Sequence, residues 1–331
     1  MRRRDLLAGG SVVVFASLLG MPPIAAQAQE KYPSRPVRLI VPTPAGGVYD
    51  LMGRLFMDKI GPSLGTVVVE NRAGGNATVG VTAAAMSAPD GYTLLLGSNS
   101  THIFQPAMMS APPYDPVKQF TPISTLSASW ACVAVSPGLP IRSLGELIDY
   151  AKENPGKLTF GMRGVGDVSH MTAELLKQLT GNISLQSIPY SAMAQAVRDL
   201  MTGDLSMTLP LLTRNLAELH AAGKIRLLAV TAPKRLSIAP DIPTAIESGV
   251  PNMTAAEFFY LFAPSGTPAS ILQQLNDIAR AALTDHEFQK KLLAAGFDPM
   301  FAGGLDETRA LFGVERARWL PIAEATGMKI N

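Results

Sequence analysis

Residues 37–96 read VRLIVPTPAGGVYDLMGRLFMDKIGPSLGTVVVENRAGGNATVGVTAAAMSAPDGYTLLL, and this stretch decides the fold. It opens with a β-rich run at residues 37–41, and a Pro/Gly turn then leads into a helical pattern that starts at Asp50. Two further β-rich runs follow at residues 66–70 and 92–96, with a small-residue helix between them. This βαβαβ order predicts parallel strands with right-handed crossovers, and therefore an α/β fold.

The alternation continues through the rest of the chain, from the buried-strand pattern around Cys132 onward. Strands are predicted at residues 157–161, 185–188, 206–208, 225–231 and 257–263. Helices are predicted at residues 144–152, 167–180, 192–201, 216–222, 268–284, 285–295 and 306–327. About 300 residues is long for one core, so we expect two lobes, each a mainly parallel sheet flanked by helices.

The first 28 residues read as an export signal. Three arginines at residues 2–4 precede an apolar stretch, and the small-x-small sequence at residues 26–28 predicts cleavage after about Ala28. An uncleaved membrane anchor is disfavoured, because the apolar run is short of the ~20 residues that span a bilayer and two prolines end it. Twin-arginine and general export both stay open. The mature protein is expected in the periplasm.

The composition excludes several function classes. The signal holds three of the 28 basic and one of the 26 acidic residues, so 25 of each remain and the mature chain has no net charge. This argues against a role in binding nucleic acid or an anionic membrane, since either would need a basic face. Cys132 is the single cysteine and lies in an apolar run, so we expect a packed thiol rather than a nucleophile. The four histidines form no metal motif, and no GxSxG, Walker or SxxK motif occurs, so neither a cofactor nor an enzyme is expected.

Two glycine-rich loops lie where a ligand is expected, between a strand and a helix. The first loop covers residues 42–50, where Gly46 and Gly47 let a ligand approach the backbone closely and the following helix start favours a carboxylate. The second loop covers residues 161–170 and could form an anion-binding nest. A tight structural turn is the alternative for the first loop, and the second is a poor dinucleotide fingerprint because its glycine spacing is wrong. Loops from two lobes that close on a small anion describe a hinged clamshell.

A set of motifs in fixed order resembles one protein family along nearly the whole mature chain. The motifs are YPSRPV at residues 32–37, P-x-PAGG-x-x-D at 42–50, VENR-x-G at 69–74, APDGYTL at 88–94, PYDP at 113–116, Ser169-His170, Pro189-Tyr190, LAVT at 228–231, Pro243-Thr244 and FAP-x-GTP at 262–268. The chain resembles Bug-type periplasmic solute receptors, the binding components of tripartite tricarboxylate transporters.

The resemblance implies a fold like type II periplasmic binding proteins. Lobe 1 would comprise residues 29–131 and 253–331, and lobe 2 residues 132–252. In such receptors the two loops pinch one carboxylate of the ligand, and on this chain the residues expected at that site are Ala45, Gly46, Gly47, Tyr49, Asp50, Arg163, Gly164, Gly166, Asp167, Ser169, His170, Tyr190 and Pro210. For His170, a helix-capping or core role is the alternative.

Departures from the family pattern concern the part of the pocket beyond that carboxylate. Tyr49 stands where Ser or Thr is frequent in the family, and residues 209–212 are Leu-Pro-Leu-Leu where an Asp-Asn pair is usual. We therefore expect a monocarboxylate or an aromatic carboxylate as ligand. Arg163 could bind a carboxylate in bidentate fashion, but an unpaired buried charge is costly, so a pair between Arg163 and Asp167 is favoured.

Three roles remain to be compared. The first is a monomeric receptor that delivers a small organic acid to the membrane subunits of a tripartite transporter. The second is a sensor that presents the same ligand to a membrane histidine kinase, which the sequence cannot separate from the first. The third is an exported hydrolase, whose candidate pair would be Ser169 and His170; adjacent residues at a helix start point in different directions, so this role is disfavoured.

Overall fold

A computed structural model describes residues 32–300 and 303–329 of the chain. The expected export signal at residues 1–28 lies outside these described residues. Within them, the chain from Pro33 onward forms one compact unit that holds two β-sheets. The α/β fold predicted from the sequence is confirmed.

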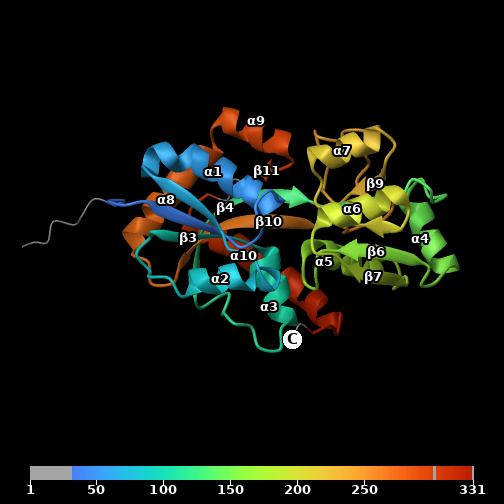
Figure 1. Cartoon of the computed structure of the whole chain (residues 1–331), viewed down its shortest axis with the longest axis horizontal. Helices are drawn as coiled ribbons and strands as arrows, with labels where there is room; N and C mark the ends of the chain where they lie inside the picture. Colours follow the sequence, from blue (N-terminus) through green and yellow to red (C-terminus); the bar gives the residue numbers. More distant parts are fainter. Residues whose placement is uncertain (1–31, 301–302, 330–331) are drawn as a thin grey trace, which may run out of the picture. The chain divides into compact units, whose positions relative to one another are not determined.

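The first sheet is built from segments far apart in the sequence. Among the described residues its strands run in the order β11-β4-β10-β3-β1-β2. They are β1 (Val37–Val41), β2 (Val67–Asn71), β3 (Thr93–Ser98), β4 (Phe120–Trp130), β10 (Ala256–Pro264) and β11 (Asp298–Pro299). β1 pairs in parallel with both β2 and β3, as the βαβαβ order predicted. β10, orange in Figure 1, enters the same sheet as the blue strand β1.

The second sheet is formed by the middle of the chain. Its described strands run in the order β7-β6-β8-β5-β9. They are β5 (Cys132–Val135), β6 (Leu158–Met162), β7 (Leu185–Pro189), β8 (Met207–Thr208) and β9 (Arg226–Val230). β6 pairs in parallel with β7, and the two lie side by side in Figure 1. Only Ala131 separates β4 of the first sheet from β5 of the second, so the buried strand predicted around Cys132 is divided between the sheets.

Both sheets are mixed, which modifies the expectation of mainly parallel sheets. β10 pairs antiparallel with β3 and β4, and β5 pairs antiparallel with β8 and β9. The reason is the connection between the sheets, since β4 leads out of the first sheet and β10 leads back into it beside β4. Strands that leave and return side by side are antiparallel and need no helical crossover. β4 was not predicted, because its sequence FTPISTLSASW lacks an apolar run although most of it is buried.

The helices agree with the sequence prediction to within a few residues at their ends. They are α1 (Val48–Leu64), α2 (Thr78–Ala85), α3 (Gln105–Met108), α4 (Leu144–Glu153), α5 (Val168–Leu179), α6 (Met193–Thr202), α7 (Arg214–Ala221), α8 (Ala269–Leu283), α9 (His286–Ala295) and α10 (Leu305–Ala325). Two single turns, η1 (Gly75–Ala77) and η2 (Ser100–Phe104), precede α2 and α3. Of these elements, η1, η2 and α3 had no counterpart in the sequence prediction.

Burial of the middle of the first sheet leaves the ends of its strands as the places where a ligand could bind. β3 is buried at all six positions and β10 at all nine, so the middle of the first sheet is shielded on both faces. Because the strands β1, β2 and β3 are parallel, their carboxyl ends lie together at the same end of that sheet. This end carries the first loop, the η1 turn and the η2 turn, and it is where the candidate site is built.

Candidate functional site

The first loop joins β1 to α1 and leaves the helix start without a side-chain cap. Gly46 adopts a left-handed conformation with φ of 82°, and Gly47 is the N-cap residue. Within the described residues no side chain hydrogen-bonds to the first-turn N–H groups of α1. Ala45, Gly46 and Gly47 are exposed. An uncapped helix start with an accessible backbone attracts an anion, through its free N–H groups and the helix dipole.

Asp50 lies in the first turn of α1 but points back into its own loop. Its Oδ2 accepts from Gly46 N–H at 2.9 Å, and its Oδ1 accepts from Asn71 Nδ2 at 2.9 Å. Arg54 Nε forms an ion pair with Oδ1 at 3.0 Å. Burial alone would raise the pKa of Asp50, but the hydrogen bonds from Arg54, Gly46 and Asn71 hold it below its ordinary value. The carboxylate therefore shapes the loop and its oxygens are already engaged.

Tyr49 enters a buried polar network behind the first loop. Its hydroxyl lies 2.6 Å from Ser98 Oγ and donates to Glu257 Oε1 at 2.9 Å. Ser100 donates to the same carboxylate from its backbone N–H at 2.9 Å and from its Oγ at 2.8 Å. Burial raises the pKa of Glu257 and that of Tyr49. Four polar side chains thus tie α1, the end of β3 and β10 together.

The second loop joins β6 to α5 and, unlike the first, is capped from within. Asp167 is the N-cap residue, and its Oδ1 accepts from His170 N–H at 2.9 Å and from Ser169 Oγ at 2.7 Å. Its Oδ2 lies 3.6 Å from Arg163 Nε, so the ion pair favoured from the sequence is formed. The N-terminus of α5 is therefore occupied by the carboxylate of its own loop.

His170 completes this arrangement. Its Nδ1 accepts from Gly166 N–H at 3.2 Å, so the proton of the neutral ring lies on Nε2. Burial lowers the pKa of His170, which favours that neutral form. The nearest acid to Nε2 is Glu174, at 3.7 Å on the next turn. His170 thus holds the loop backbone, which matches the capping alternative considered from the sequence.

The second loop lies directly against segments of the first sheet. The Arg163 guanidinium lies 5.6 Å from the centre of the Tyr49 ring. Asn76 in η1 donates from Nδ2 to the carbonyl oxygen of Val165 at 3.0 Å. A Cβ atom added to Gly164 would lie 3.1 Å from Asn76 Oδ1, so the contact is close. Asn76 itself has a left-handed φ of 51°, a conformation that asparagine tolerates better than most residues.

Two predicted residues lie apart from these contacts. The Tyr190 hydroxyl donates to Asp199 Oδ2 of α6 at 2.9 Å, and burial raises the pKa of Tyr190 to about 12. The carbonyl oxygen of Pro210 accepts from Cys132 N–H at 2.9 Å, where the chain passes between the sheets. The Cys132 thiol is fully buried, and burial raises its pKa, as expected for a packed thiol.

The residues that sequence reasoning missed include Asn76 and Glu257, and also Gln105, which follows η2 and lies against Gly166 of the second loop. For Asn76 the signal was present, since a Gly-Gly-Asn sequence follows the end of a strand. Glu257 is an acid inside an otherwise apolar strand, which also marks a special environment. Gln105 carried no sequence signal, because its position depends on the unpredicted η2 turn.

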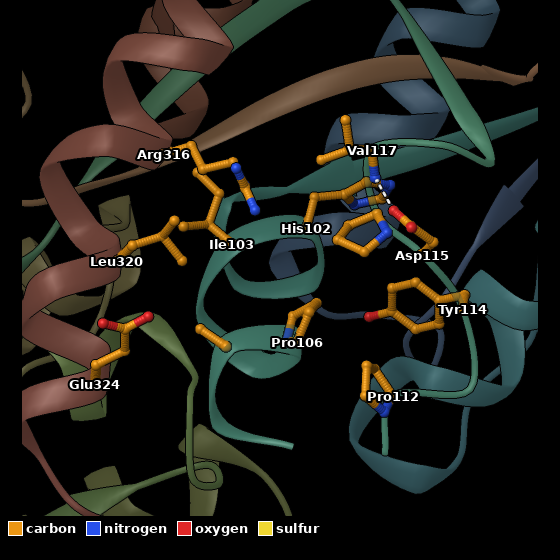
Figure 2. Close-up of a pocket in the computed structure, with 12 residues that line it drawn as sticks. His102, Ile103, Pro106, Pro112, Tyr114, Asp115, Val117, Arg316, Leu320 and Glu324 are labelled. Carbon is orange, nitrogen blue, oxygen red and sulfur yellow. Dashed lines mark hydrogen bonds between the residues drawn. The ribbon is translucent and has the colours of Figure 1, made fainter. Parts of the chain in front are cut away.

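A separate cavity of about 520 Å³ lies between the η2–α3 segment, the Pro-rich loop after it and α10. Figure 2 shows Tyr114 and Asp115 on one side of it, and Arg316, Leu320 and Glu324 on the α10 side. The Asp115 carboxylate is already engaged by Val117 N–H at 2.9 Å, drawn as a dashed line. Its wall holds one arginine, one histidine and two acids, so this cavity favours no single ligand class.

Two further features, a metal-ion site and a membrane-spanning helix, find no support among the described residues. In residues 32–300 and 303–329, no group of three or more His, Cys, Asp or Glu side chains is placed to hold a metal ion. In the same ranges, no helix is long and apolar enough to cross a membrane.

Comparison with known proteins gives matches over most of the chain. The model of the tripartite tricarboxylate transporter family receptor matches residues 54–328. The chain is 34% identical to protein BugT of Bordetella pertussis over 304 residues, which is 91% of this chain and 92% of BugT. Among solved structures, Rpa4515 of R. palustris with adipate is 32% identical, with a TM-score of 0.83 over 90% of this chain and 99% of that one. MatC from Rhodopseudomonas palustris with bound malate is 28% identical, with a TM-score of 0.79 over 88% of this chain and 100% of that one.

Proposed function

Because the chain belongs to the tripartite tricarboxylate transporter receptor family, we propose that it binds a small organic carboxylate between the two loops and delivers it to the membrane subunits of such a transporter. We place it in the periplasm after cleavage near Ala28. The lobe boundaries are proposed at residues 29–131 with 253–331, and 132–252. The protein is proposed to act as a monomer without a cofactor.

The observation that carries this proposal is the uncapped N-terminus of α1. The helix has 17 residues, so its dipole is fully developed, and its first turn is bordered by exposed glycines. Asp50, the acid nearest to it, is turned toward Arg54 and Asn71. Thr43 Oγ1 on the same loop is buried without a partner among the described residues. A ligand carboxylate would satisfy groups that the protein itself leaves open.

The ligand is proposed to be a monocarboxylate or an aromatic carboxylate. The two related structures named above hold adipate and malate, which are dicarboxylates. In this chain, however, the one cation of the second loop, Arg163, is already paired with Asp167. Nearby Glu257 is also acidic and buried. A second ligand carboxylate would therefore find no free cation there, and burying it would be costly.

A catalytic role finds little support in the geometry of Ser169 and His170. The Ser169 hydroxyl donates to Asp167 Oδ1 rather than to an imidazole. The acceptor nitrogen of His170 is used by Gly166 N–H. Ser169 and His170 therefore form no nucleophile–base pair with each other, and the family is one of solute receptors. The alternative of a sensor that presents ligand to a membrane histidine kinase would use the same site and differ only in its partner.

The test uses a pair of variants at Gly47. Its φ of −88° and ψ of 176° suit an N-cap side chain, and a Cβ there would meet nothing closer than Pro44 O at 3.7 Å. In Gly47→Asp the new carboxylate should cap α1, add about 0.5 kcal/mol to the free energy of unfolding and displace the ligand carboxylate. Gly47→Ala is the control, since it adds a methyl group without charge.

The measurement is a thermal-shift and calorimetric screen of residues 29–331 with benzoate, adipate, L-malate, citrate and glutamate. A ligand at 100-fold its Kd should stabilise the wild type by about 2.7 kcal/mol. We expect Gly47→Asp to lose this shift and Gly47→Ala to keep it. Wild-type affinity in Gly47→Asp would refute the site, and tight citrate or glutamate binding without benzoate binding would refute the proposed ligand class.

A further inference from the structure

Gln105 is a buried side chain whose polar atoms have no partner. It is the first residue of α3, directly after the π-helical turn η2 that follows the carboxyl end of β3. The residue is fully buried, and neither Oε1 nor Nε2 makes a hydrogen bond within the described part of the chain. An unpaired buried amide destabilises a fold, so its retention calls for an explanation. π-helical turns are frequent at functional sites.

The position of Gln105 connects it to the candidate site. A Cβ atom added to Gly166 would lie 3.1 Å from Gln105 Cα and 3.2 Å from Gln105 Cγ. The second loop therefore lies directly on this residue. Gln105 thus stands where the second loop meets the strand-end edge of the first sheet.

Other glutamines of the chain show what a structural role looks like. Gln289 Nε2 donates to the carbonyl oxygen of Leu283 at 2.8 Å, and Gln119 Oε1 accepts from Asp115 N–H at 2.7 Å. Each of these amides fixes a nearby backbone group. Gln105 fixes none, although it is more deeply buried than either.

We propose that Gln105 is a ligand-binding residue of the receptor site, and that it recognises a primary carboxamide on the ligand. An amide side chain offers a donor and an acceptor side by side, and another carboxamide pairs with both. A carboxylate has only acceptors, so it would leave Oε1 facing a negative oxygen. This inference rests on the proposed function, since the ligand's single carboxylate is assigned to the start of α1. The ligand class is therefore the half-amide of a dicarboxylic acid or an aromatic acid that carries a carboxamide.

The experiment compares adipate with its half-amide adipamate, and succinate with succinamate, on the wild type and Gln105→Leu. Leucine has nearly the shape of glutamine without the polar atoms. We expect the wild type to bind a half-amide at least about ten-fold more tightly than the matching diacid, and Gln105→Leu to lose that preference. Without ligand, Gln105→Leu should melt no lower than the wild type, because an unpaired polar group has been removed.

Gln289→Leu is the matched control, and it should melt lower while keeping the wild-type affinities. Equal binding of diacid and half-amide by the wild type, or unchanged affinities in Gln105→Leu, would overturn the inference and leave the receptor proposal intact. A loss of stability in Gln105→Leu like that of Gln289→Leu, with binding retained, would assign Gln105 a structural role. If no carboxylate of either panel binds the wild type, the receptor proposal fails and this inference fails with it.

Discussion

The two loops of the candidate site have the same architecture but treat their helix starts in opposite ways. Each connects a parallel strand to the N-terminus of a helix through two or more glycines. In the first loop the acid, Asp50, is the third helical residue and turns back to Gly46 N–H, which leaves α1 uncapped. In the second loop the acid, Asp167, is the N-cap residue and closes the start of α5.

A shift of the acid by three positions therefore decides what each loop can do. An acid at the N-cap satisfies the backbone donors that an anion would need, whereas an acid one turn later leaves them free. The first loop is suited to hold a ligand carboxylate. The second loop caps its own helix start and serves as a preformed surface that packs on Tyr49, Asn76 and Gln105.

The largest expected effect is a difference in the free energy of unfolding between Gly166→Ala and Gly46→Ala. Both glycines have a left-handed backbone, with φ of 76° and 82°, so alanine costs each about 1 kcal/mol. Only at Gly166 would the new Cβ also meet backbone, 3.1 Å away at Gln105, whereas at Gly46 nothing lies within 4 Å. We expect losses in the free energy of unfolding of about 3 kcal/mol for Gly166→Ala and about 1 kcal/mol for Gly46→Ala, measured in urea.

Gly164→Ala provides a control for this comparison, because its φ is not left-handed and the three atoms nearest to its new Cβ would all belong to the Asn76 side chain. Without the cost of a left-handed backbone, its loss in the free energy of unfolding should stay well below that of Gly166→Ala. Equal losses in Gly166→Ala and Gly46→Ala would mean that the second loop does not pack on α3 in solution.

The next largest effect on the free energy of unfolding concerns Asp167, the N-cap residue of α5. Asp167→Ala removes the cap of α5 and leaves Arg163 without its acid, and we expect a loss of about 2 kcal/mol in the free energy of unfolding. Asp285→Ala is the matched control, since Asp285 caps α9 through Phe288 N–H at 2.8 Å and pairs with Lys59 at 2.9 Å. Its ion pair is partly exposed and contributes little, so about 1 kcal/mol is expected there. Urea unfolding of both variants measures the difference, and equal losses would contradict a larger contribution from the less exposed Arg163–Asp167 pair.

The sequence predicted the two loops and most of the elements that carry them, because strand and helix periodicity is a local property. The Arg163–Asp167 pair followed from the same local reasoning, since a buried charge four residues from an acid needs a partner. β4 was missed because it is buried by its neighbours and not by its own apolar residues. It gains its strand conformation from pairing with β10, which lies more than a hundred residues away in the chain.

The polar contacts that distinguish the loops could not be predicted for a related reason. Whether Asp50 faces a ligand or Arg54 depends on a side-chain rotation, not on the spacing of residues. The partners of Glu257, namely Tyr49 and Ser100, come from two other elements. Gln105 is connected to the candidate site only through Gly166 of the second loop, which lies against it. Such contacts between distant segments require the folded structure.

The smallest effect is a difference in the pH ranges over which the two loops weaken. Burial lowers the pKa of His170 below its unfolded value of 6.5, so its contribution is present above pH 6.5 and is lost as the pH falls. The pKa of Asp50 lies below its unfolded value of 3.8, so its contribution is present above pH 3.8 and is lost only below it. The second loop should therefore loosen first on acidification.

The probe is His170→Asn, whose side chain can still accept from Gly166 N–H but does not titrate. Near pH 7.5 the wild type should be more stable than His170→Asn by about 1 kcal/mol, and this advantage should shrink toward pH 4.5. Asp50→Asn should instead keep a constant deficit over that range, because Asp50 stays ionised throughout. Amide exchange at Gly46 and Gly166 gives the local measurement, and a wild-type advantage over His170→Asn that does not change with pH would show that His170 is not a neutral acceptor in the second loop.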